Sequence, residues 1–442
     1  MEFYHTGQIT KDLAKKSFAA GVAMVMPGGD APLFALSGLA KKKTALQVEH
    51  GYWSKQYDYV TVTTDGEKLA AATDIVLSTK AGAVNDPSLP VAGSAGNDRD
   101  GVALPTRGTI TDINRVIPGM ILRFQAAPGA QGAGGYKAPE NILVTAVNVA
   151  TSTLTVLRGF DGTTAQTIPT GAKLLQVGNA HEEGSSRPTS QAVIPQRHLN
   201  YTHIFRNSWD VTGTLRGTAL AYGEQPEANN KGDCAHYHAR DIEFATFFSR
   251  KSMGVRNNKP FHTMDGIEAL IEKYAPQHLV SAGATTTYTQ LQALLNPLLN
   301  FRTSKSSNGN KRTIYCGGTA RHVLSEIGRL SGNYQLTDGM TSYGLQFTSF
   351  KTSRGQFDIV EHPLFNTNQQ LSEMAVVMDL SSFDYAYLTG RDTVHEQYNQ
   401  LGQYSDGVDA TGGVLTTELT IEMQNPFSCG IIYGLKAAAK DA

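Results

Sequence analysis

Few residues of this chain have types and spacing that could support chemistry, and the densest group is the segment CAHYH. It holds Cys234, His236 and His238, all of which are ligands that zinc accepts. Zinc sites usually pair such a cluster with a second one elsewhere, and none is visible. On a helix, His236 would also point away from the other two residues. We therefore predict polar positions on a helix and no metal site.

Acid and base chemistry finds no better candidate. Glu182 and Glu183 are adjacent, so they would not face each other on a strand, and no partner carboxylate is identifiable. The pair is typical of a charged turn. The chain has no P-loop, G-x-S-x-G elbow, H-E-x-x-H motif or dinucleotide fingerprint. Its Ser, His and Asp residues cannot be assembled into a triad from sequence. We predict no catalytic or cofactor-binding site, and hence a protein that is not an enzyme.

The composition is globular, with a low share of charge. Of 442 residues, 40% are hydrophobic and 17% are charged, and the formal net charge is -1. A typical charged share is about 25%. The centres of protein interfaces are depleted of charge, but a polar surface rich in Thr, Ser and Asn would give the same number, so both explanations stay open. The near-neutral balance argues against a basic nucleic-acid binder.

Three features bear on where the protein works. No uninterrupted apolar run is long enough to cross a bilayer. The N-terminus lacks the apolar core of a secretion signal. The three cysteines are odd in number and far apart, which argues against a disulfide framework and suits synthesis in a reducing cytoplasm. They are Cys234, Cys316 and Cys429.

The chain is predicted to begin with an arm. Residues 1–50 contain a short amphipathic helix that ends at Pro27. Near the end of the arm, Lys41, Lys42 and Lys43 form a basic run. It is interpreted as a solvated face, with contact to an acidic patch on a neighbour as the alternative. A strand is predicted over Tyr57–Thr64 and a loop over 80–107.

A compact β unit is predicted at residues 108–178. Alternating and β-branched residues predict five short strands, and Asp161-Gly162 is a hairpin signal between the last two. Strands at this spacing suggest a small barrel or sandwich. The strands are expected over 108–113, 119–124, 140–149, 152–160 and 172–178. The loop between the second and third strands has no apolar anchor, so we expect a mobile tip at Gly129, Gly132, Gly134 and Gly135.

An extended strand over 196–218 and a long helix over Cys234–Lys251 are predicted next. Apolar residues fall on one stripe of this helix. Asp233 is available as its N-cap. Arg240 and Glu243 are spaced for an ion pair one turn apart.

Residues 259–370 alternate helices with strands. Helical spacing predicts helices over Thr263–Tyr274, with Thr263 as the cap, Thr289–Leu299 and Thr319–Leu330. Strands are expected over 312–316, 344–350 and 356–362. The tail, residues 374–436, returns to β structure, and Leu419, Ile421 and Met423 share one face of a strand.

Four segments, taken in order, resemble a known family. They are RGFDGTTAQTIPTGAKLLQVGNAHEEGSS (Arg158–Ser186), NYTHIFRNSWDVTGT (Asn200–Thr214), RDIEFATFFSRK (Arg240–Lys251) and HTMDGIEALI (His262–Ile271). Together they resemble the major capsid proteins of tailed bacteriophages, which have the Hong Kong 97-type fold. The likeness is greatest to the SU-ten-like major head proteins.

This resemblance implies an α+β fold and a division of the chain into named parts. A long hairpin called the E-loop cannot bury its own faces, so it must lie on a neighbouring subunit. The parts are an N-terminal arm (1–50), an E-loop region (51–222) with an inserted β-barrel-like subdomain at 108–178, the spine helix of the peripheral domain (223–259), an axial domain (260–370), and the peripheral strands with the C-terminus (371–442).

The implied function is that of a major capsid protein. Such a protein self-assembles as pentamers and hexamers into the icosahedral shell around the double-stranded DNA genome of a tailed phage. Its partners would be copies of itself, a scaffolding protein and a portal, with a decoration protein as a further candidate. Packaged DNA would be met without sequence-specific contact, and no membrane is involved. The protein would be made in the host bacterial cytoplasm and end in the virion. Candidate contacts between subunits are Arg206, Trp209, Arg240, Glu243, Lys41, Lys42 and Lys43.

Two alternatives stay open. An encapsulin forms a bacterial compartment with the same fold, but encapsulins are usually shorter and lack the inserted β unit. A secreted β-rich protein that binds or cleaves carbohydrate would explain the abundant Thr, Gly and Tyr. That class predicts an export signal and clustered carboxylates with aromatic platforms, and the sequence has neither.

Overall fold

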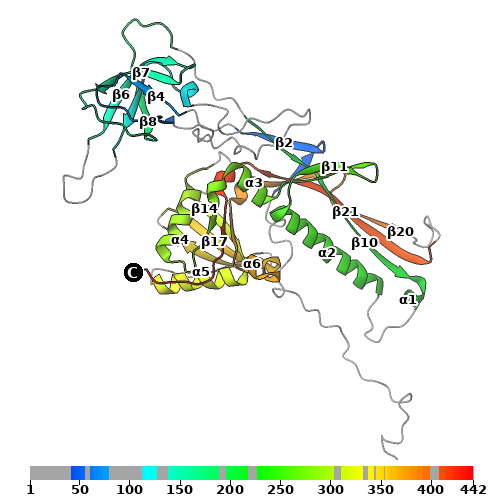
Figure 1. Cartoon of the computed structure of the whole chain (residues 1–442). Coiled ribbons are helices and arrows are strands. Elements are labelled where there is room, and N and C mark those ends of the chain that lie inside the picture. The colour runs from blue at the N-terminus through cyan, green and yellow to red at the C-terminus, as the bar shows by residue number, and fades with distance from the viewer. Residues whose placement is uncertain are drawn as a thin grey trace, which may run out of the picture.

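The computed structural model describes residues 41–54, 60–78, 112–126, 138–188, 196–217, 226–302, 310–331, 337–342, 345–352, 354–398 and 408–441. Figure 1 shows a body in which two sheets adjoin, with a separate small β unit above it. The body contains both long helices and strands, which confirms the predicted α+β class. The predicted arm helix, the loop at 80–107 and the four loop glycines lie outside the described residues.

The larger sheet of the body has seven strands, in the order β13-β22-β18-β14-β17-β16-β15. Two pairs, β13–β22 and β14–β17, are parallel and the others are antiparallel. Helices α4 (Tyr288–Leu295) and α5 (Gly318–Ser331) pack on it through a shared apolar core. The strands are β13 (Leu279–Ser281), β22 (Gly430–Tyr433), β18 (Ala375–Met378), β14 (Lys311–Cys316), β17 (Gln356–Glu361), β16 (Leu345–Lys351) and β15 (Thr337–Ser342).

The helices predicted in this part are confirmed, with shifted ends. α4 starts on Thr287, whose hydroxyl accepts from the Gln290 N–H while the Gln290 side chain accepts from the Thr287 N–H. Pro297 ends the α-helical geometry, and the chain continues as the short 3₁₀ turn η4 (Asn296–Leu299). The other 3₁₀ turns and the one-turn helix are η3 (Pro276–His278), η5 (Pro363–Thr367), η6 (Leu380–Ser382), η7 (Pro426–Ser428) and α6 (Gln369–Ser372).

Helix α3 (Ile267–Tyr274) is shorter than predicted, and Thr263 is not its cap. Thr263 ends a strand instead, and Gly266 occupies the N-cap position without a side-chain hydrogen bond. The backbone of the preceding helix passes very close here. A Cβ on Gly266 would lie 2.9 Å from both the Ala245 oxygen and the Ser249 nitrogen. Close packing of two helix ends therefore sets where α3 begins.

The second sheet of the body is built on the long strand β21 (Ala410–Met423). Its order is β1-β19-β21-β10, and β20 pairs with β21 beyond the end of β19. β1 runs parallel to β19, and the remaining pairs are antiparallel. Leu419, Ile421 and Met423 enter the main core, as the alternation predicted. The other strands are β1 (Lys41–Ala45), β19 (Phe383–Leu388), β10 (His203–Thr212) and β20 (Val394–Tyr398).

Helix α2 (Pro226–Phe248) lies along β10 and β21 (Figure 1). It starts eight residues before the predicted boundary, so Asp233 is inside the helix and is not its cap. Proline suits the first turn of a helix, and Gly232, which suggested a boundary, is tolerated within it. The predicted strand over 196–218 also ends early, because Gly213–Gly217 form the short helix α1. Within the described chain, no helix has the length and apolar character needed to span a membrane.

The separate β unit is a closed barrel of six strands, in the order β3-β8-β5-β6-β7-β4. The first and last strands meet through the Asp65 N–H to Val76 O and Ser78 N–H to Thr63 O hydrogen bonds, both 2.8 Å. Apolar side chains from all six strands fill the interior. The strands are β3 (Thr61–Thr63), β4 (Asp74–Val76), β5 (Met120–Phe124), β6 (Glu140–Asn148), β7 (Thr153–Phe160) and β8 (Lys173–Asn179).

The predicted barrel is thus confirmed, but it is wider than residues 108–178, because β3 and β4 close it. Asp112–Arg115 form a 3₁₀ turn, η2, where the first strand was predicted. Asp161 and Gly162 do form a turn, with φ of 59° and 68°. The turn is not a hairpin, because β7 pairs with β6 and β4 while β8 pairs with β3 and β5.

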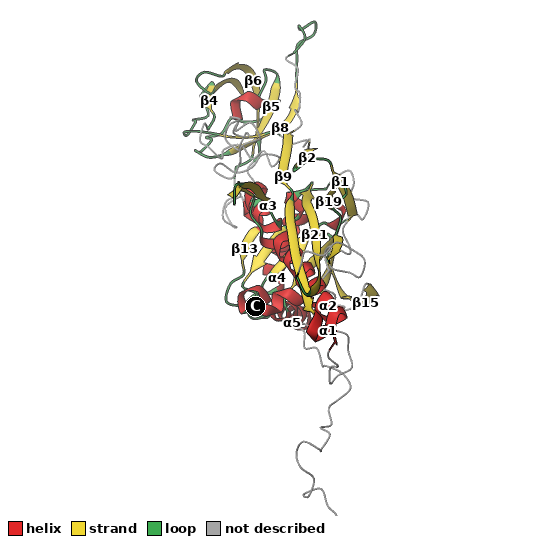
Figure 2. Cartoon of the chain, turned by 90° about the vertical axis from the view of Figure 1, so that its right-hand side faces the viewer, coloured by secondary structure: helices red, strands yellow, loops and turns green. Residues whose placement is uncertain are grey.

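Two antiparallel ribbons complete the fold. β2 (Glu49–Ser54) pairs with β9 (Gln196–Tyr201), and this ribbon lies between the body and the barrel, as Figure 2 shows from the side. β11 (Ser252–Arg256) pairs with β12 (Lys259–Thr263) to form a hairpin that projects from the body beside β2.

Candidate subunit interfaces and their anchors

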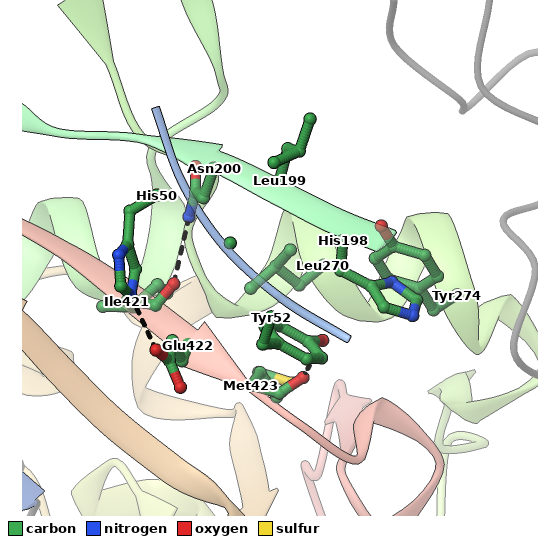
Figure 3. Close-up of a pocket in the computed structure, with 11 residues that line it drawn as sticks. His50, Tyr52, His198, Leu199, Asn200, Leu270, Tyr274, Ile421, Glu422 and Met423 are labelled. Atoms are coloured by element: carbon green, nitrogen blue, oxygen red, sulfur yellow. Dashed lines mark hydrogen bonds and ion pairs between the residues drawn. The ribbon is translucent and has the colours of Figure 1, made fainter. Parts of the chain in front are cut away.

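The β2–β9 ribbon is fixed to the body by a junction of buried side chains (Figure 3). Residues of β2, β9, α3 and β21 surround a cavity of about 10 Å³, which is room for about one water molecule. The lining residues are His50, Gly51, Tyr52, His198, Leu199, Asn200, Leu270, Tyr274, Ile421, Glu422 and Met423. The cavity is too small for a cofactor, so the junction is a structural joint.

Asn200 connects three segments at this junction. Its Nδ2 donates to the carbonyl oxygens of Asp265 (3.1 Å) and Ile421 (3.3 Å). Its Oδ1 accepts from the N–H groups of Asp265 (2.8 Å) and Tyr201 (3.0 Å). Asn200 is buried, and buried polar groups must be paired. The amide therefore holds β9 against the segment before α3 and against β21.

The next residues of the same stretch extend this network. The Thr202 hydroxyl donates to Glu418 Oε1 (2.7 Å), and both side chains are buried. Arg391 Nε contacts the other oxygen of Glu418 at 3.1 Å. The ring of His262, on the projecting hairpin, hydrogen-bonds the Thr202 carbonyl. The segment NYTH thus joins the ribbon to β21 through the side chains of Asn200 and Thr202, and to the hairpin through the Thr202 carbonyl.

Aromatic rings of the ribbon also pack against helix α3. The rings of Tyr52 and His198 stack with centroids 4.8 Å apart, and His198 meets Tyr274 edge-on, also at 4.8 Å. Ser54 Oγ lies 2.6 Å from His198 Nε2. Burial, with a smaller contribution from the charge of Lys273, lowers the pKa of His198 to about 4. His198 is therefore neutral at physiological pH and stays compatible with a buried position.

An electrostatic clasp, made by Lys43, His50, Asp384 and Glu422, holds strand β1 on the body. Asp384 and Glu422 are buried and lie opposite each other on β19 and β21. Lys43 forms ion pairs with both, at 2.6 Å to Asp384, and His50 Nε2 lies 2.6 Å from Glu422. Burial alone would raise the pKa of Glu422, but the hydrogen bonds from His50 and Lys43 outweigh it and lower the pKa to about 2.

Large apolar side chains are exposed on the projecting parts of the subunit. Leu46 after β1 is 83% exposed, Trp53 on the ribbon is 69% exposed, and Val255 on the hairpin is 73% exposed. The barrel adds others on its outer wall: Leu69, Val149, Leu157, Leu175 and Val177. Exposed apolar side chains of this size are candidates for contacts with other molecules.

Comparison with known sequences shows the family of the chain. The sequence model of the SU10 major capsid protein family matches residues 5–436 of the chain. The chain belongs to this family. The major capsid protein of Pseudomonas phage PaMx41 is 31% identical over 446 residues, covering 98% of this chain and 96% of that protein. The resemblance found in the sequence is confirmed, and the protein is a phage capsid protein.

Solved structures give weaker likenesses. The capsid of a native GTA particle matches with a TM-score of 0.41 and 7% identity, covering 98% of each chain. An encapsulin complex from Synechococcus elongatus matches with a TM-score of 0.37 and 8% identity, covering 56% of this chain and 79% of that one. Both scores lie below 0.5, so the assignment to the SU10 major capsid protein family rests on sequence.

Two of the predicted contacts in this capsid subunit are wrong, because the side chains are buried within it. Trp209 is only 2% exposed, and its Nε1 lies 3.1 Å from His395 Nε2. Glu243 is fully buried, with Oε2 3.6 Å from His362 Nε2. The predicted Arg240–Glu243 pair is absent as well, because Glu243 turns inward and Arg240 meets Asp241 at 3.1 Å.

The remaining candidates are at least partly exposed. Arg206, Arg240, Lys41 and Lys42 lie on the surface, with Lys42 3.9 Å from Asp392. Lys43 is half-buried in the clasp, and its charge is neutralised by Asp384 and Glu422 of the same capsid subunit. No local pattern in the sequence could reveal this clasp, since its acidic members, Asp384 and Glu422, lie more than three hundred residues after Lys43.

The CAHYH segment lies on α2 and shows no ligand geometry. Cys234 is buried, His236 is exposed, and His238 is held by Asn207 Oδ1 and Thr417 Oγ1, each at 2.7 Å. No group of three metal-ligating side chains occurs among the residues that the structure describes.

Proposed function

We propose that copies of this chain assemble as pentamers and hexamers into an icosahedral shell around double-stranded DNA. The observation that carries the proposal is the form of the subunit. A two-stranded ribbon leads away from the body and carries a barrel whose outer wall bears apolar side chains. An isolated ribbon is marginally stable, so it needs a partner surface.

We assign the parts of the chain in the order that the family resemblance implies. Residues 1–50 act as the arm and 51–222 as the E-loop region, with the barrel built from 60–78 and 112–188. Residues 223–259 hold the spine helix, here α2. Residues 260–370 form the axial domain, and 371–442 complete the peripheral domain and the axial sheet. The last segment thus contributes to two parts and not to the peripheral domain alone. β18 and β22 support this change, since both pair inside the seven-stranded sheet.

We further propose a purely structural role, without catalysis. The partners would be a scaffolding protein, a portal and a decoration protein, and the subunit would be made in the host bacterial cytoplasm. The formal net charge of -1 supports contact with DNA that is weak and independent of sequence. The match to a phage family and to a phage capsid protein favours a virion over an encapsulin compartment.

Assembly of the purified chain tests the proposal. Interfaces between obligate partners bury roughly 2,000–5,000 Å². Subunits that are refolded from denaturant and concentrated, or co-expressed with their scaffolding protein, should therefore assemble into closed shells. Negative-stain microscopy shows shells directly, and sedimentation velocity measures their share. A stable monomer at every concentration, with the ribbon protected from proteolysis, would refute self-assembly.

A further inference from the structure

Two lysines lie close together where α3, β9 and the start of the β11–β12 hairpin meet (Figure 1). Lys273, on α3, is only 6% exposed. Lys251, directly before β11, is partly exposed, but its Nζ is enclosed and has no hydrogen-bond partner in the described chain. Burial lowers the pKa of Lys273, Asp265 opposes this, and the nearby charge of Lys251 lowers the pKa further. A lysine is almost never buried unless it is paired, so this arrangement calls for a partner.

The carboxylates of the same subunit do not balance these two charges. Burial lowers the pKa of both lysines, and the charge of Asp265 raises it only in part. Asp265 Oδ1 accepts from the backbone N–H of Lys251 at 2.8 Å. Glu49 also acts on Lys251, but its Oε1 lies 3.4 Å from Arg197. Among the described residues, neither ammonium group forms an ion pair. Asp265 thus faces two ammonium groups, and one positive charge is left over.

Each ammonium group lies over an aromatic ring instead. Lys251 Nζ is 4.6 Å from the centre of the Tyr201 ring, and Lys273 Nζ is 5.5 Å from that of Tyr274. A contact between a cation and a ring is weaker than a hydrogen bond between two charged groups. The lysine stem has four carbons and turns easily. Both cations can therefore exchange the ring for a carboxylate without a change in the backbone.

The surface beside the lysines is apolar and uncovered in the single subunit. Met253, two residues after Lys251, is 64% exposed, and Val255 and Phe261 of the same hairpin are 73% and 41% exposed. A lone hairpin is only marginally stable in water, as is the adjoining β2–β9 ribbon, so both need a partner surface. Apolar side chains around a few desolvated polar groups are typical of the centre of a protein interface. The lysines therefore lie where a second copy is expected to cover the subunit.

We propose that Lys251 and Lys273 bind an acidic side chain of a second copy of this chain. The inference rests on the proposed self-assembly and names the chemistry of one of its contacts. The acid would enter at the base of the hairpin, and the ammonium groups would turn from the rings to its oxygens. A carboxylate has two oxygens, so one acid can accept from both lysines. It also supplies the negative charge that the subunit itself does not provide there.

Crosslinking of wild-type shells with a carbodiimide tests the contact directly. This reagent joins an amine to a carboxylate that touches it, forming an amide while the carbodiimide takes up the water. Shells are assembled from equal amounts of ¹⁵N-labelled and unlabelled chain, and digested peptides are analysed by mass spectrometry. We expect Lys251 or Lys273 linked to an Asp or Glu, with labelled peptides joined to unlabelled ones. Links of uniform isotopic composition alone would place the acid in the same chain and overturn the proposal.

Removal of the two charges gives a second readout, with opposite effects on subunit and shell. A buried charge without a partner costs stability, so Lys251→Met with Lys273→Met should keep or raise the urea midpoint of the unassembled subunit. The same variant should need about tenfold or more protein to form shells, because the acid of the second copy is left unpaired. Lys231→Met, on the exposed side of α2, is the control and should change neither quantity. A lower urea midpoint for the double variant would show that the lysines serve the subunit itself.

The outcomes separate this inference from the proposed function. Absence of shells from the wild-type chain contradicts self-assembly itself. Wild-type shells without mixed-isotope links at Lys251 or Lys273 contradict the contact alone, as does unchanged assembly of the double variant. Inorganic phosphate added to the unassembled wild-type subunit checks the other source of an anion. If phosphate raises the urea midpoint and the shells show no mixed links, the lysines bind a free anion and the proposal fails.

Discussion

Asn200→Asp tests whether the junction side chains hold the ribbon on the body. Aspartate has the same shape and keeps the oxygen that accepts from Asp265 and Tyr201. It lacks the donor that now serves the carbonyls of Asp265 and Ile421. Leaving a buried acceptor unpaired costs about 1–2 kcal/mol each. With the added buried charge, we expect unfolding free energy to fall by about 3 kcal/mol.

The measurement is urea unfolding of the unassembled subunit, followed by circular dichroism. Asn148→Asp is the matched control, because Asn148 is exposed and only its oxygen is used, accepting from Ala150 and Thr151. That change should stay within about 0.5 kcal/mol. The loss from Asn200→Asp should also shrink in acid, since a protonated carboxyl can donate to one carbonyl. Equal effects of the two substitutions would refute the argument.

Three further predictions concern other buried charges. Glu140→Gln breaks the bidentate ion pair with buried Arg158, in which Nε and Nη2 lie 2.6 and 2.9 Å from the two carboxylate oxygens. It should destabilise the barrel by about 3 kcal/mol, measured as faster amide exchange in the barrel strands. Lys43→Met leaves two buried carboxylates facing each other and should loosen β1 by about 2 kcal/mol, while Lys41→Met on the same strand changes little; proteolysis of β1 separates them. Folding lowers the pKa of His198 from 6.5 to about 4, so the unfolded chain takes up a proton at a higher pH than the folded one. The free energy of unfolding should therefore decrease as the pH falls from 6.5 to 4, and His198→Gln should flatten this slope in urea titrations.

Local patterns in the sequence predicted most elements of the seven-stranded sheet and its helices. α4, α5, β14 and β17 repeat apolar residues at the spacing of a helix or a strand over a full element, and each lies within a few residues of its predicted place. The start of α2 was missed because the segment before Cys234 is polar and contains Gly232. Its helical form depends on packing along β10, which no local pattern records.

Contacts that are distant in sequence account for the other errors. The strands that close the barrel, β3 and β4, have three residues each, too few to show a period. Asn200 lies in the stretch that carries the family resemblance, but its partners Asp265 and Ile421 come from elements far along the chain. Glu243 was expected at the surface because a charged residue on a helix usually is. His362 and the surrounding core give it a buried site instead.

The low charge content of the chain can now be interpreted. Eleven charged side chains are buried in the described subunit, among them Glu140, Arg312, Asp384, Glu418 and Glu422. These eleven are a smaller share of the buried residues than the 17% of the whole sequence, so burial within the subunit does not account for the low charge. The exposed surface bears large apolar side chains on the ribbon, the hairpin and the barrel. A polar surface rich in Thr and Ser would account for the missing charge but not for these side chains, so their joint occurrence favours burial between capsid subunits.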